Sequence, residues 1–380
     1  MGSVLYGINS PRLVRSSPLK DGRKVCYHRC CIARIDKDLN IIEQHRRSGL
    51  EFKNFEDYTR KILDVLSCIH ANATDKRRRC SYGVITTISR GYDAPTASAF
   101  AASVGCNETF TFCDKPDDDG TEIAKALGYE KIHRVHSKAF VKNNSFLEAE
   151  ALASGETGST FIAFEELYRN KILIIGSRGD SVYERLHGNV NDCFDFHEGN
   201  QLSQTSLTIY ENMLKNNSIT LSVPLIGADK WSNMARISNS EEMKAFSIGD
   251  DYDRPIARRI LEEAGVERPM FGQRKFGAGV SYNLDNFYSI KQKMSVKSYQ
   301  ALSAYKESYP CDLWADIKYQ IYFYWINRSI YTNYLLSKIG LHFKIHAKGD
   351  KVGMIANPYS TMMLHWGISM IRKRYKVIQK

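Results

Sequence analysis

YGVITTISRGYDAPTASAFAASVG, residues 82–105, holds a strand, a glycine turn and the start of a helix in direct succession. Val84–Ile88 is a β-branched run that is typical of a buried parallel strand. After the turn Ser89–Asp93, Pro95 suits the first turn of a helix whose small residues allow it to lie close against a sheet. This geometry aims backbone N–H groups at one point where an anion can sit, although an ordinary βα turn without a ligand has the same pattern.

A second buried run followed by a glycine turn stands at residues 171–180, KILIIGSRGD. Further strands are expected at 108–113 and 131–136, and helices at 121–131, 146–153 and 158–168. Strands that alternate with helices at this spacing predict an α/β fold with a doubly wound parallel sheet. Ligands of such sheets bind beyond the carboxyl ends of the strands, near a topological switch point.

Each of the two glycine turns ends in an aspartate, Asp93 in the first and Asp180 in the second. Magnesium prefers hard oxygen ligands, usually one or two carboxylates together with phosphate oxygens. Two carboxylates beside phosphate-binding amides therefore predict a site for a magnesium–nucleotide complex.

The composition is that of an ordinary globular protein, with 43% hydrophobic and 25% charged residues in a chain of 380. No apolar run reaches the roughly 18 residues of a membrane span, and the first residues lack the apolar core of a signal peptide. The nine cysteines are irregularly spaced, and the cluster Cys26, Cys30 and Cys31 has no second pair to complete a zinc site. We therefore expect a cytoplasmic protein without a transmembrane segment.

The net charge of +11 is unevenly distributed along the chain. Residues 1–80 contain 17 Lys and Arg and 9 Asp and Glu residues, residues 81–280 contain 21 and 28, and residues 281–380 contain 15 and 5. The asymmetry predicts domain boundaries. We expect an N-terminal hairpin and helix region at 1–79, a nucleotide-binding α/β domain at 80–280, and a helical C-terminal domain at 281–380. The basic flanks fit solvated faces better than a polyanion-binding surface, and nucleic acid stays an alternative partner.

The flanking regions have their own local patterns. Residues 1–24 are expected as an extended, poorly structured arm, followed by two strands that a polar turn at 37–40 joins. Residues 55–70 have helical spacing, with Asn54 as the N-cap. Residues 313–341 form an aromatic-rich helix that we expect in the core, and 362–380 a docked terminal helix.

Two further clusters have simpler interpretations. Asp250, Asp251 and Asp253 include cation-binding residue types, but Asp253-Arg254-Pro255 fits a helix start with Pro255 at its first position. The two histidines His133 and His136 are expected on opposite faces of a strand, each partnered within the fold.

The two turns resemble motifs of a known family. ISRGYDAPTASAFAASVG, residues 88–105, resembles the pyrophosphatase loop of the adenine nucleotide alpha hydrolase superfamily, whose usual form is Ser-Gly-Gly-x-Asp-Ser. More narrowly, it is similar to the synthetase domain of asparagine synthetase-like proteins. IIGSRGDSVYE, residues 174–184, is similar to that family's second motif, Ser-Gly-x-Gly-x-Asp-Glu, and residues 249–279 resemble its basic segment. The resemblance covers about residues 80–280.

The resemblance implies ATP and Mg²⁺ as ligands and an AMP-forming ligase as the activity. A carboxylate or sugar-linked substrate would attack the α-phosphate and release pyrophosphate, and an amine would then displace AMP. The implied catalytic residues are Asp93, Asp180 and Lys275, of which the two aspartates would hold magnesium. The implied nucleotide-binding residues are Ser89, Arg90, Gly91, Tyr92, Thr111, Phe112, Gly176, Ser177, Gly179 and Arg274, with Thr111 or Phe112 meeting adenine.

The chain departs from the family pattern at three positions. Arg90 replaces a loop glycine, Ala94 a serine, and Ser181 a glutamate. Because the family's amidotransferase half needs a cysteine where this chain has Gly2, ammonia would come from a separate amine donor protein. A catalytically degenerate ATP-binding scaffold or sensor and an RNA-modifying enzyme of the same superfamily stay open as alternatives.

Overall fold

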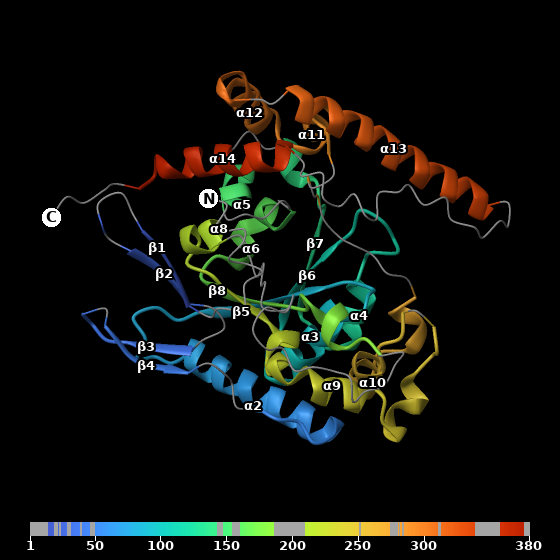
Figure 1. Ribbon diagram of the computed structural model, residues 1–380. Helices are drawn as coiled ribbons and strands as arrows, with labels where there is room; N and C mark the ends of the chain where they lie inside the picture. Colours follow the sequence, from blue (N-terminus) through green and yellow to red (C-terminus); the bar gives the residue numbers. More distant parts are fainter. Residues whose placement is uncertain are drawn as a thin grey trace. The chain divides into compact units, whose positions relative to one another are not determined.

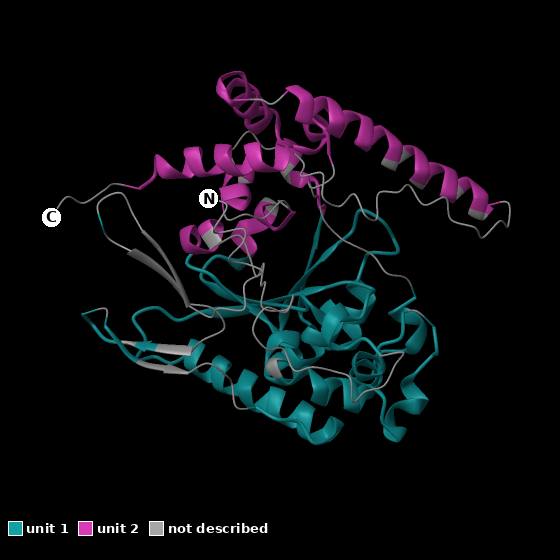
Figure 2. Ribbon diagram, viewed as in Figure 1, with its two compact units in different colours: residues 1–135, 168–207, 217–277 teal, residues 136–167, 208–216, 278–380 magenta. Residues whose placement is uncertain are grey.

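The computed structural model has an α/β architecture that divides into two compact units (Figure 2). It describes residues 14–18, 22, 24–28, 32–38, 40–45, 50–142, 147–153, 160–185, 210–250, 252–273, 280, 282, 285–310, 313–338 and 358–375. Unit 1 comprises residues 1–135, 168–207 and 217–277, and unit 2 comprises residues 136–167, 208–216 and 278–380. Both units are therefore assembled from separate segments of the chain.

Unit 1 is built on a five-stranded sheet in which all neighbouring strands are parallel (Figure 1). The strands are β5 (Gly83–Ile88), β6 (Glu108–Phe112), β7 (Lys131–Val135), β8 (Lys171–Ile175) and β9 (Ile219–Ser222). The four strands expected from the sequence are confirmed to within one residue at each end, whereas β9 was not predicted. The parallel α/β architecture is also confirmed, and it is consistent with a doubly wound fold.

The strand order is β7-β6-β5-β8-β9, with the first strand of the sheet at its centre. β5 pairs with β6 on one side, where Ile88 lies opposite Thr111, and with β8 on the other, where Thr86 lies opposite Ile174. The chain thus builds outward in one direction and then crosses to the other side. The topological switch point lies between β5 and β8.

The middle of the sheet contains a buried polar network as well as β-branched apolar residues. Thr86 is fully buried, and its hydroxyl lies 2.8 Å from the Thr109 hydroxyl of β6 and 3.1 Å from the Ser98 hydroxyl. The Tyr129 hydroxyl donates to the Ser98 carbonyl at 2.8 Å, and burial raises its pKa. Because buried hydroxyls are costly without partners, this network fixes β5, β6 and the helix carrying Ser98 in one register.

The helix α2 (Phe55–Ala73) begins at Asn54, whose side chain accepts from the amide of Asp57 at 2.9 Å, as its sequence predicted. Tyr58, Ile62 and Leu66 bury one face of it at four-residue spacing. The hydrogen bond from Lys61 lowers the pKa of Asp57 to about 2.

Five further helices of unit 1 are α3 (Asp93–Ser103), α4 (Thr121–Ala126), α7 (Gly179–Val182), α9 (Trp231–Ser238) and α10 (Pro255–Glu263). α10 starts at Pro255, which confirms the interpretation of that segment as a helix start. The 3₁₀ segments η5 (Val223–Leu225), η6 (Ala228–Lys230), η7 (Glu241–Phe246) and η8 (Arg268–Met270) connect them. α6 (Glu165–Tyr168) leads into β8.

The N-terminal region contains two separate antiparallel hairpins. β1 (Val14–Pro18) pairs with β2 (Lys24–His28), so the expectation of a poorly structured arm over residues 1–24 is wrong for the part that the structure describes. Pairing with β2 gives the backbone N–H and C=O groups of β1 hydrogen-bond partners, and the composition of this segment does not predict that pairing. β3 (Ile32–Ile35) and β4 (Ile41–His45) pair around the polar turn as predicted, but the first predicted strand, which began at residue 25, corresponds to β2 and β3 in two different sheets.

Unit 2 is helical in its described part. Its elements are η1 (Ala139–Lys142), α5 (Leu147–Ala153), η2 (Thr160–Phe164), α8 (Tyr210–Lys215), α11 (Phe287–Lys293), α12 (Val296–Ser308), α13 (Leu313–Lys338) and α14 (Pro358–Arg372). α14 lies directly on α5, because a Cβ atom on Gly367 would be 2.6 Å from the amide nitrogen of Ala153. With Met363 and Trp366 also buried, the predicted docked terminal helix is confirmed over its described residues.

The expectation that the aromatic residues of α13 lie in the core is wrong. Trp314, Tyr324 and Trp325 are 70%, 66% and 64% exposed, whereas Tyr319 is buried. Periodicity alone predicts the helix but not what covers its faces. Among the helices that the structure describes, none combines the length and apolarity that crossing a membrane requires.

Candidate functional site

The two glycine turns lie at the same edge of the sheet, beyond the carboxyl ends of the neighbouring strands β5 and β8. Loop 1 comprises residues 89–93 and loop 2 residues 176–180. Because the switch point separates these two strands, the loops occupy the position where ligands of open α/β sheets bind.

Loop 2 packs directly against Asp93, the first residue of α3. A Cβ atom on Gly176 would be less than 3.0 Å from the carbonyl oxygen of Asp93, and one on Gly179 would lie 2.6 Å from Asp93 Oδ1. Both positions therefore need glycine for this close approach. Asp180 follows Gly179 directly, so its Cα lies about 3.8 Å from that of Gly179. The fold thus brings the two predicted aspartates together.

Loop 1 is held from the side by residues 268–273. The Arg90 carbonyl accepts from the amide of Gly272 at 2.8 Å, and Arg90 Nε donates to the Met270 carbonyl at 3.1 Å. Within the loop, the Ser89 hydroxyl accepts from the amide of Gly91 at 3.3 Å. Arg90, which replaces a glycine of the motif that loop 1 resembles, is therefore bound to a neighbouring segment through its Nε and its backbone carbonyl.

Asp93 forms an ion pair with Arg254, the residue that precedes α10. The Arg254 side chain is 4% exposed, and that of Asp93 is 29% exposed. The guanidinium also lies over the rings of Tyr252 and Tyr92, at 4.8 and 5.8 Å from their centroids. A buried cation therefore balances one of the two predicted magnesium ligands.

A second buried arginine lies behind loop 1. Arg258 is 2% exposed, donates to the Tyr92 hydroxyl, and lies 5.3 Å from the centroid of that ring. Its Nε is buried and has no hydrogen-bond partner among the residues that the structure describes. Burial raises the pKa of the Tyr92 hydroxyl to about 12, so it stays neutral at physiological pH. Arg254 balances the charge of Asp93, whereas Arg258 adds a buried positive charge behind loop 1 that favours an anionic ligand.

Tyr92 itself is fully buried and forms part of an aromatic cluster, with Tyr252 at 5.0 Å and Phe271 at 5.8 Å between ring centroids. Its side chain therefore supports loop 1 from behind. Only its backbone is placed to meet a ligand.

Loop 2 contains a residue in an uncommon backbone conformation. Arg178 has φ of +71°, which is a left-handed conformation that non-glycine residues adopt infrequently. The preceding Ser177 carbonyl accepts from the Ser222 hydroxyl at 2.6 Å, which ties loop 2 to the end of β9. Such conformations concentrate at sites where the surrounding structure imposes them.

The residues predicted to meet adenine lie at the end of β6, next to loop 1. Thr111 is fully buried, and its hydroxyl accepts from the amide of Gly120 at 2.8 Å. Phe112 is 8% exposed, and its ring lies 6.4 Å from that of Phe110. Both side chains are buried in the core. Contact with adenine would therefore use the backbone groups of these residues, as the resemblance implies.

Lys275 and Arg274 lie outside the described residues, as does Asp251. Asp253 is buried and accepts from the amides of Ile248 and Gly249 at 3.2 and 3.1 Å, so it organises the start of α10. Sequence reasoning missed Arg254 as a site residue. Its place before a helix-starting proline was the available signal, but nothing local links it to Asp93.

The carboxylates of Asp93 and Asp180 suit a cation that also takes phosphate oxygens as ligands. Asp180 Oδ1 accepts one long hydrogen bond, 3.5 Å, from the Ser181 hydroxyl. In the described part of the chain, no group of three or more His, Cys, Asp or Glu residues is arranged to hold a metal ion. Magnesium would therefore need Asp93, Asp180 and ligand oxygens together.

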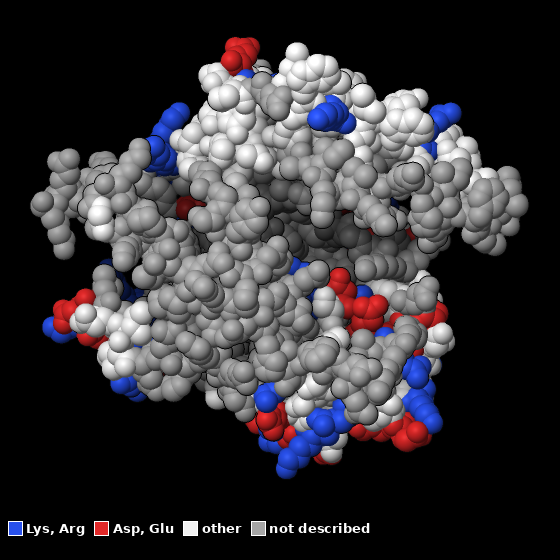
Figure 3. Space-filling view, viewed as in Figure 1, with Lys and Arg blue, Asp and Glu red and all other residues white. Residues whose placement is uncertain are grey.

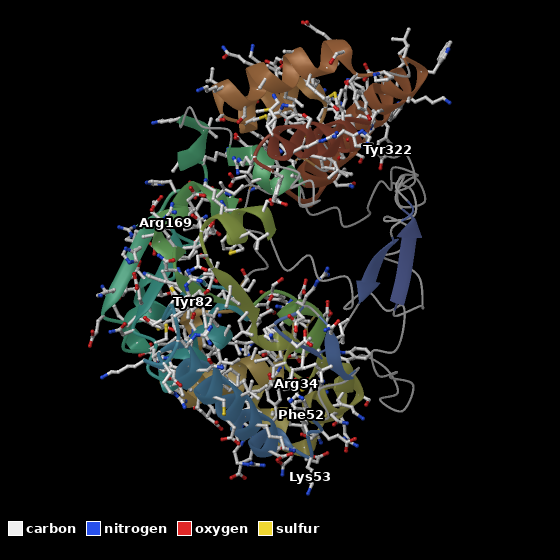
Figure 4. The ribbon with its side chains drawn as sticks, turned by 90° about the vertical axis from the view of Figure 1, so that its left-hand side faces the viewer. Arg34, Phe52, Lys53, Tyr82, Arg169 and Tyr322 are labelled. Atoms are coloured by element: carbon white, nitrogen blue, oxygen red, sulfur yellow. The ribbon has the colours of Figure 1, made fainter. Side chains whose placement is uncertain are left out.

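A separate apolar cavity lies elsewhere in unit 1. It has a volume of about 230 Å³ and is lined by residues that include Tyr82, Ile172 and Ile219 (Figure 4 labels Tyr82). These residues precede or begin strands, so this cavity is away from loops 1 and 2. Its lining carries little that would specify a polar ligand.

No protein-family model matches the chain, and the search of curated proteins gave no match.

Proposed function

We propose that this chain binds a magnesium–ATP complex at loops 1 and 2 and transfers the adenylyl group to a carboxylate or sugar-linked acceptor with release of pyrophosphate. The observation that best supports the proposal is the contact between Asp93 and Gly179. It brings the two aspartates beside backbone amides at the switch point of the sheet, next to the start of α3.

The proposed roles follow from charge and position. Asp93 and Asp180 would bind magnesium, and the amides of loops 1 and 2 would bind phosphate oxygens. Arg258 favours the negative charge of the nucleotide from behind loop 1. Lys275, by resemblance, would stabilise charge that develops on the phosphates in the transition state.

Positional isotope exchange in ATP tests this proposal, because reversible adenylation scrambles oxygen between bridging and non-bridging positions before any amine is supplied. We expect exchange in the presence of Mg²⁺ and a mixture of candidate acceptors, with the adenylate and pyrophosphate as products, and release of AMP once an amine displaces it. Lys275→Ala should lower exchange strongly and leave ATP binding largely intact, since its charge matters most in the transition state. ADP and phosphate as products would contradict the proposal.

A second candidate function is nucleotide binding without turnover, as in a scaffold or sensor. The Asp93–Arg254 ion pair favours it, because the pair occupies a carboxylate that magnesium would need. Arg90→Gly restores the family's usual loop and separates the candidates. A gain of exchange in this variant would mean that Arg90 suppresses the reaction in the natural chain. A loss of exchange would mean that Arg90 binds phosphate in an active enzyme.

A further inference from the structure

α13 carries an exposed stripe of mainly apolar residues at alternating intervals of four and three. The stripe, which we call the seam, consists of Ile317, Ile321, Tyr324, Arg328, Tyr331 and Leu335, all of them exposed. Its five apolar members are 40–66% exposed. An average interval of 3.5 residues is the spacing with which one helix packs along another in a coiled coil. Figure 3 shows the described surface around α12 and α13 as mostly uncharged, with scattered charged side chains of both signs.

The opposite face of α13 packs within unit 2. Tyr319 is buried there, with its ring centroid 6.0 Å from that of Tyr359 in α14. Gln320 donates to the Tyr359 hydroxyl at 2.9 Å, and that hydroxyl donates to Asp316. In a heptad that places Ile317 and Ile321 in the seam, Tyr319 falls at the position directly opposite. The rotation of α13 is therefore fixed with the seam pointing away from α14, and the helix continues to Lys338.

We propose that the seam is the interface through which two copies of this chain associate, with their α13 helices antiparallel. A helix of 26 residues offers more than three heptads, which is long enough for a specific helix pair. The two-fold axis would cross the seam midway between Tyr324 and Arg328, so that the two α13 helices overlap along their full length.

The charges of the seam favour this antiparallel arrangement. It pairs Ile317 with Leu335 of the other copy and Ile321 with Tyr331, while Arg328 meets the ring of Tyr324. A guanidinium over an aromatic ring is attractive. In a parallel pair Arg328 would instead face the Arg328 of the other copy, and like charges in a seam are unfavourable. The sequence of the seam is thus self-complementary in one direction only.

The oligomeric state of the full chain tests the proposal. Sedimentation and light scattering over a dilution series should give a dimer. Ile321→Glu or Tyr331→Glu should raise the dimer dissociation constant about 100-fold, because each dimer contains the change twice in its buried seam. Tyr288→Glu is the matched control, since this tyrosine is 70% exposed but lies on α11, and it should leave the dimer unchanged. Far-UV circular dichroism should show the same helical content in all variants.

Cysteine pairing tests the orientation. A mixture of the Ile317→Cys and Leu335→Cys variants should form an intermolecular disulfide under mild oxidation, above the level that wild type gives with its native cysteines. Either variant alone forming that disulfide would establish a parallel pair and overturn the antiparallel assignment. A chain that is monomeric at every dilution would overturn the dimer. The dimer would also be overturned if the chain were a monomer that sediments with phosphatidylserine vesicles and the Ile321→Glu variant did not sediment with them. The seam would then be a lipid-binding surface.

Discussion

Asp93 and Gly179 touch across the gap between two glycine turns, with Asp93 Oδ1 only 2.6 Å from where a Cβ on Gly179 would stand. One residue begins the helix that follows β5, and the other begins the helix that follows β8. The glycines of loop 2 therefore have a packing role that is independent of any ligand.

Replacement of Gly176 by alanine should destabilise unit 1 by about 3 kcal/mol, because the new methyl group collides with the backbone of Asp93. Gly91→Ala is the matched control, since its Cβ would meet only ordinary contacts at 3.6 and 3.7 Å. Urea unfolding of both variants measures the difference. Equal stability of the two would mean that loop 2 does not press on Asp93.

ATP should raise the melting temperature of the chain when Mg²⁺ is present and have little effect when it is chelated. Asp93→Asn and Asp180→Asn should each remove most of the magnesium-dependent shift, because each removes a carboxylate ligand. Asp64→Asn, on an exposed position of α2, should leave the shift intact. An unchanged shift in both site variants would place the phosphate site elsewhere.

Arg254→Met should destabilise the chain by about 2 kcal/mol, less than for a fully buried pair, because the Asp93 side chain keeps 29% of its exposure. The double variant with Asp93→Asn should lose less than the sum of the single variants, since the interaction is then absent from both sides. A double-mutant cycle by urea unfolding measures this coupling. Strict additivity would show that the ion pair does not contribute in solution.

The stability contributed by Glu148 should fall as the pH rises. This buried carboxyl accepts from the Ser295 amide at 2.5 Å and the Ser298 hydroxyl at 2.6 Å, and burial raises its pKa in spite of these hydrogen bonds. A raised pKa means that the folded state binds the proton more tightly. The contribution is therefore complete below the ordinary glutamate pKa and is lost as the pH rises through the raised value.

Glu148→Gln removes this titration, so the stability of wild type relative to the variant should decrease from acidic to neutral pH. Unfolding at a series of pH values measures it, and Glu122→Gln, an exposed position of α4, serves as the control. A difference that does not change with pH would show that Glu148 keeps an ordinary pKa.

The sequence predicted those features that are determined locally. KILII forms β8 because the four apolar residues after Lys171 suit a strand buried on both faces, and Asn54 caps α2 because its side chain reaches an amide three residues on. The parallel sheet followed from the alternation of strands and helices, and from it the meeting of the two aspartates.

The remaining features depend on contacts between distant residues. β9 is a short run, ITLS, that becomes a strand by pairing with β8. Arg254 belongs to the site only because α10 begins beside Asp93. The exposure of Tyr324 depends on which face of α13 meets α14, and helical spacing carries no information about the partner.

The packing of α14 on α5 has a consequence for how the chain is made. α5 buries Ala149 and Leu152 where Gly367 of α14 approaches, yet more than half of the polypeptide separates the two helices. During synthesis α5 emerges long before α14 and has an apolar face without its partner, while the strands of the parallel sheet can already pair. A ribosome stalled before residue 358 would hold a nascent chain that chaperones recognise at α5, and release of the last helix would end that interaction. A helix translated long after α5 therefore completes a core to which α5 contributes the first part.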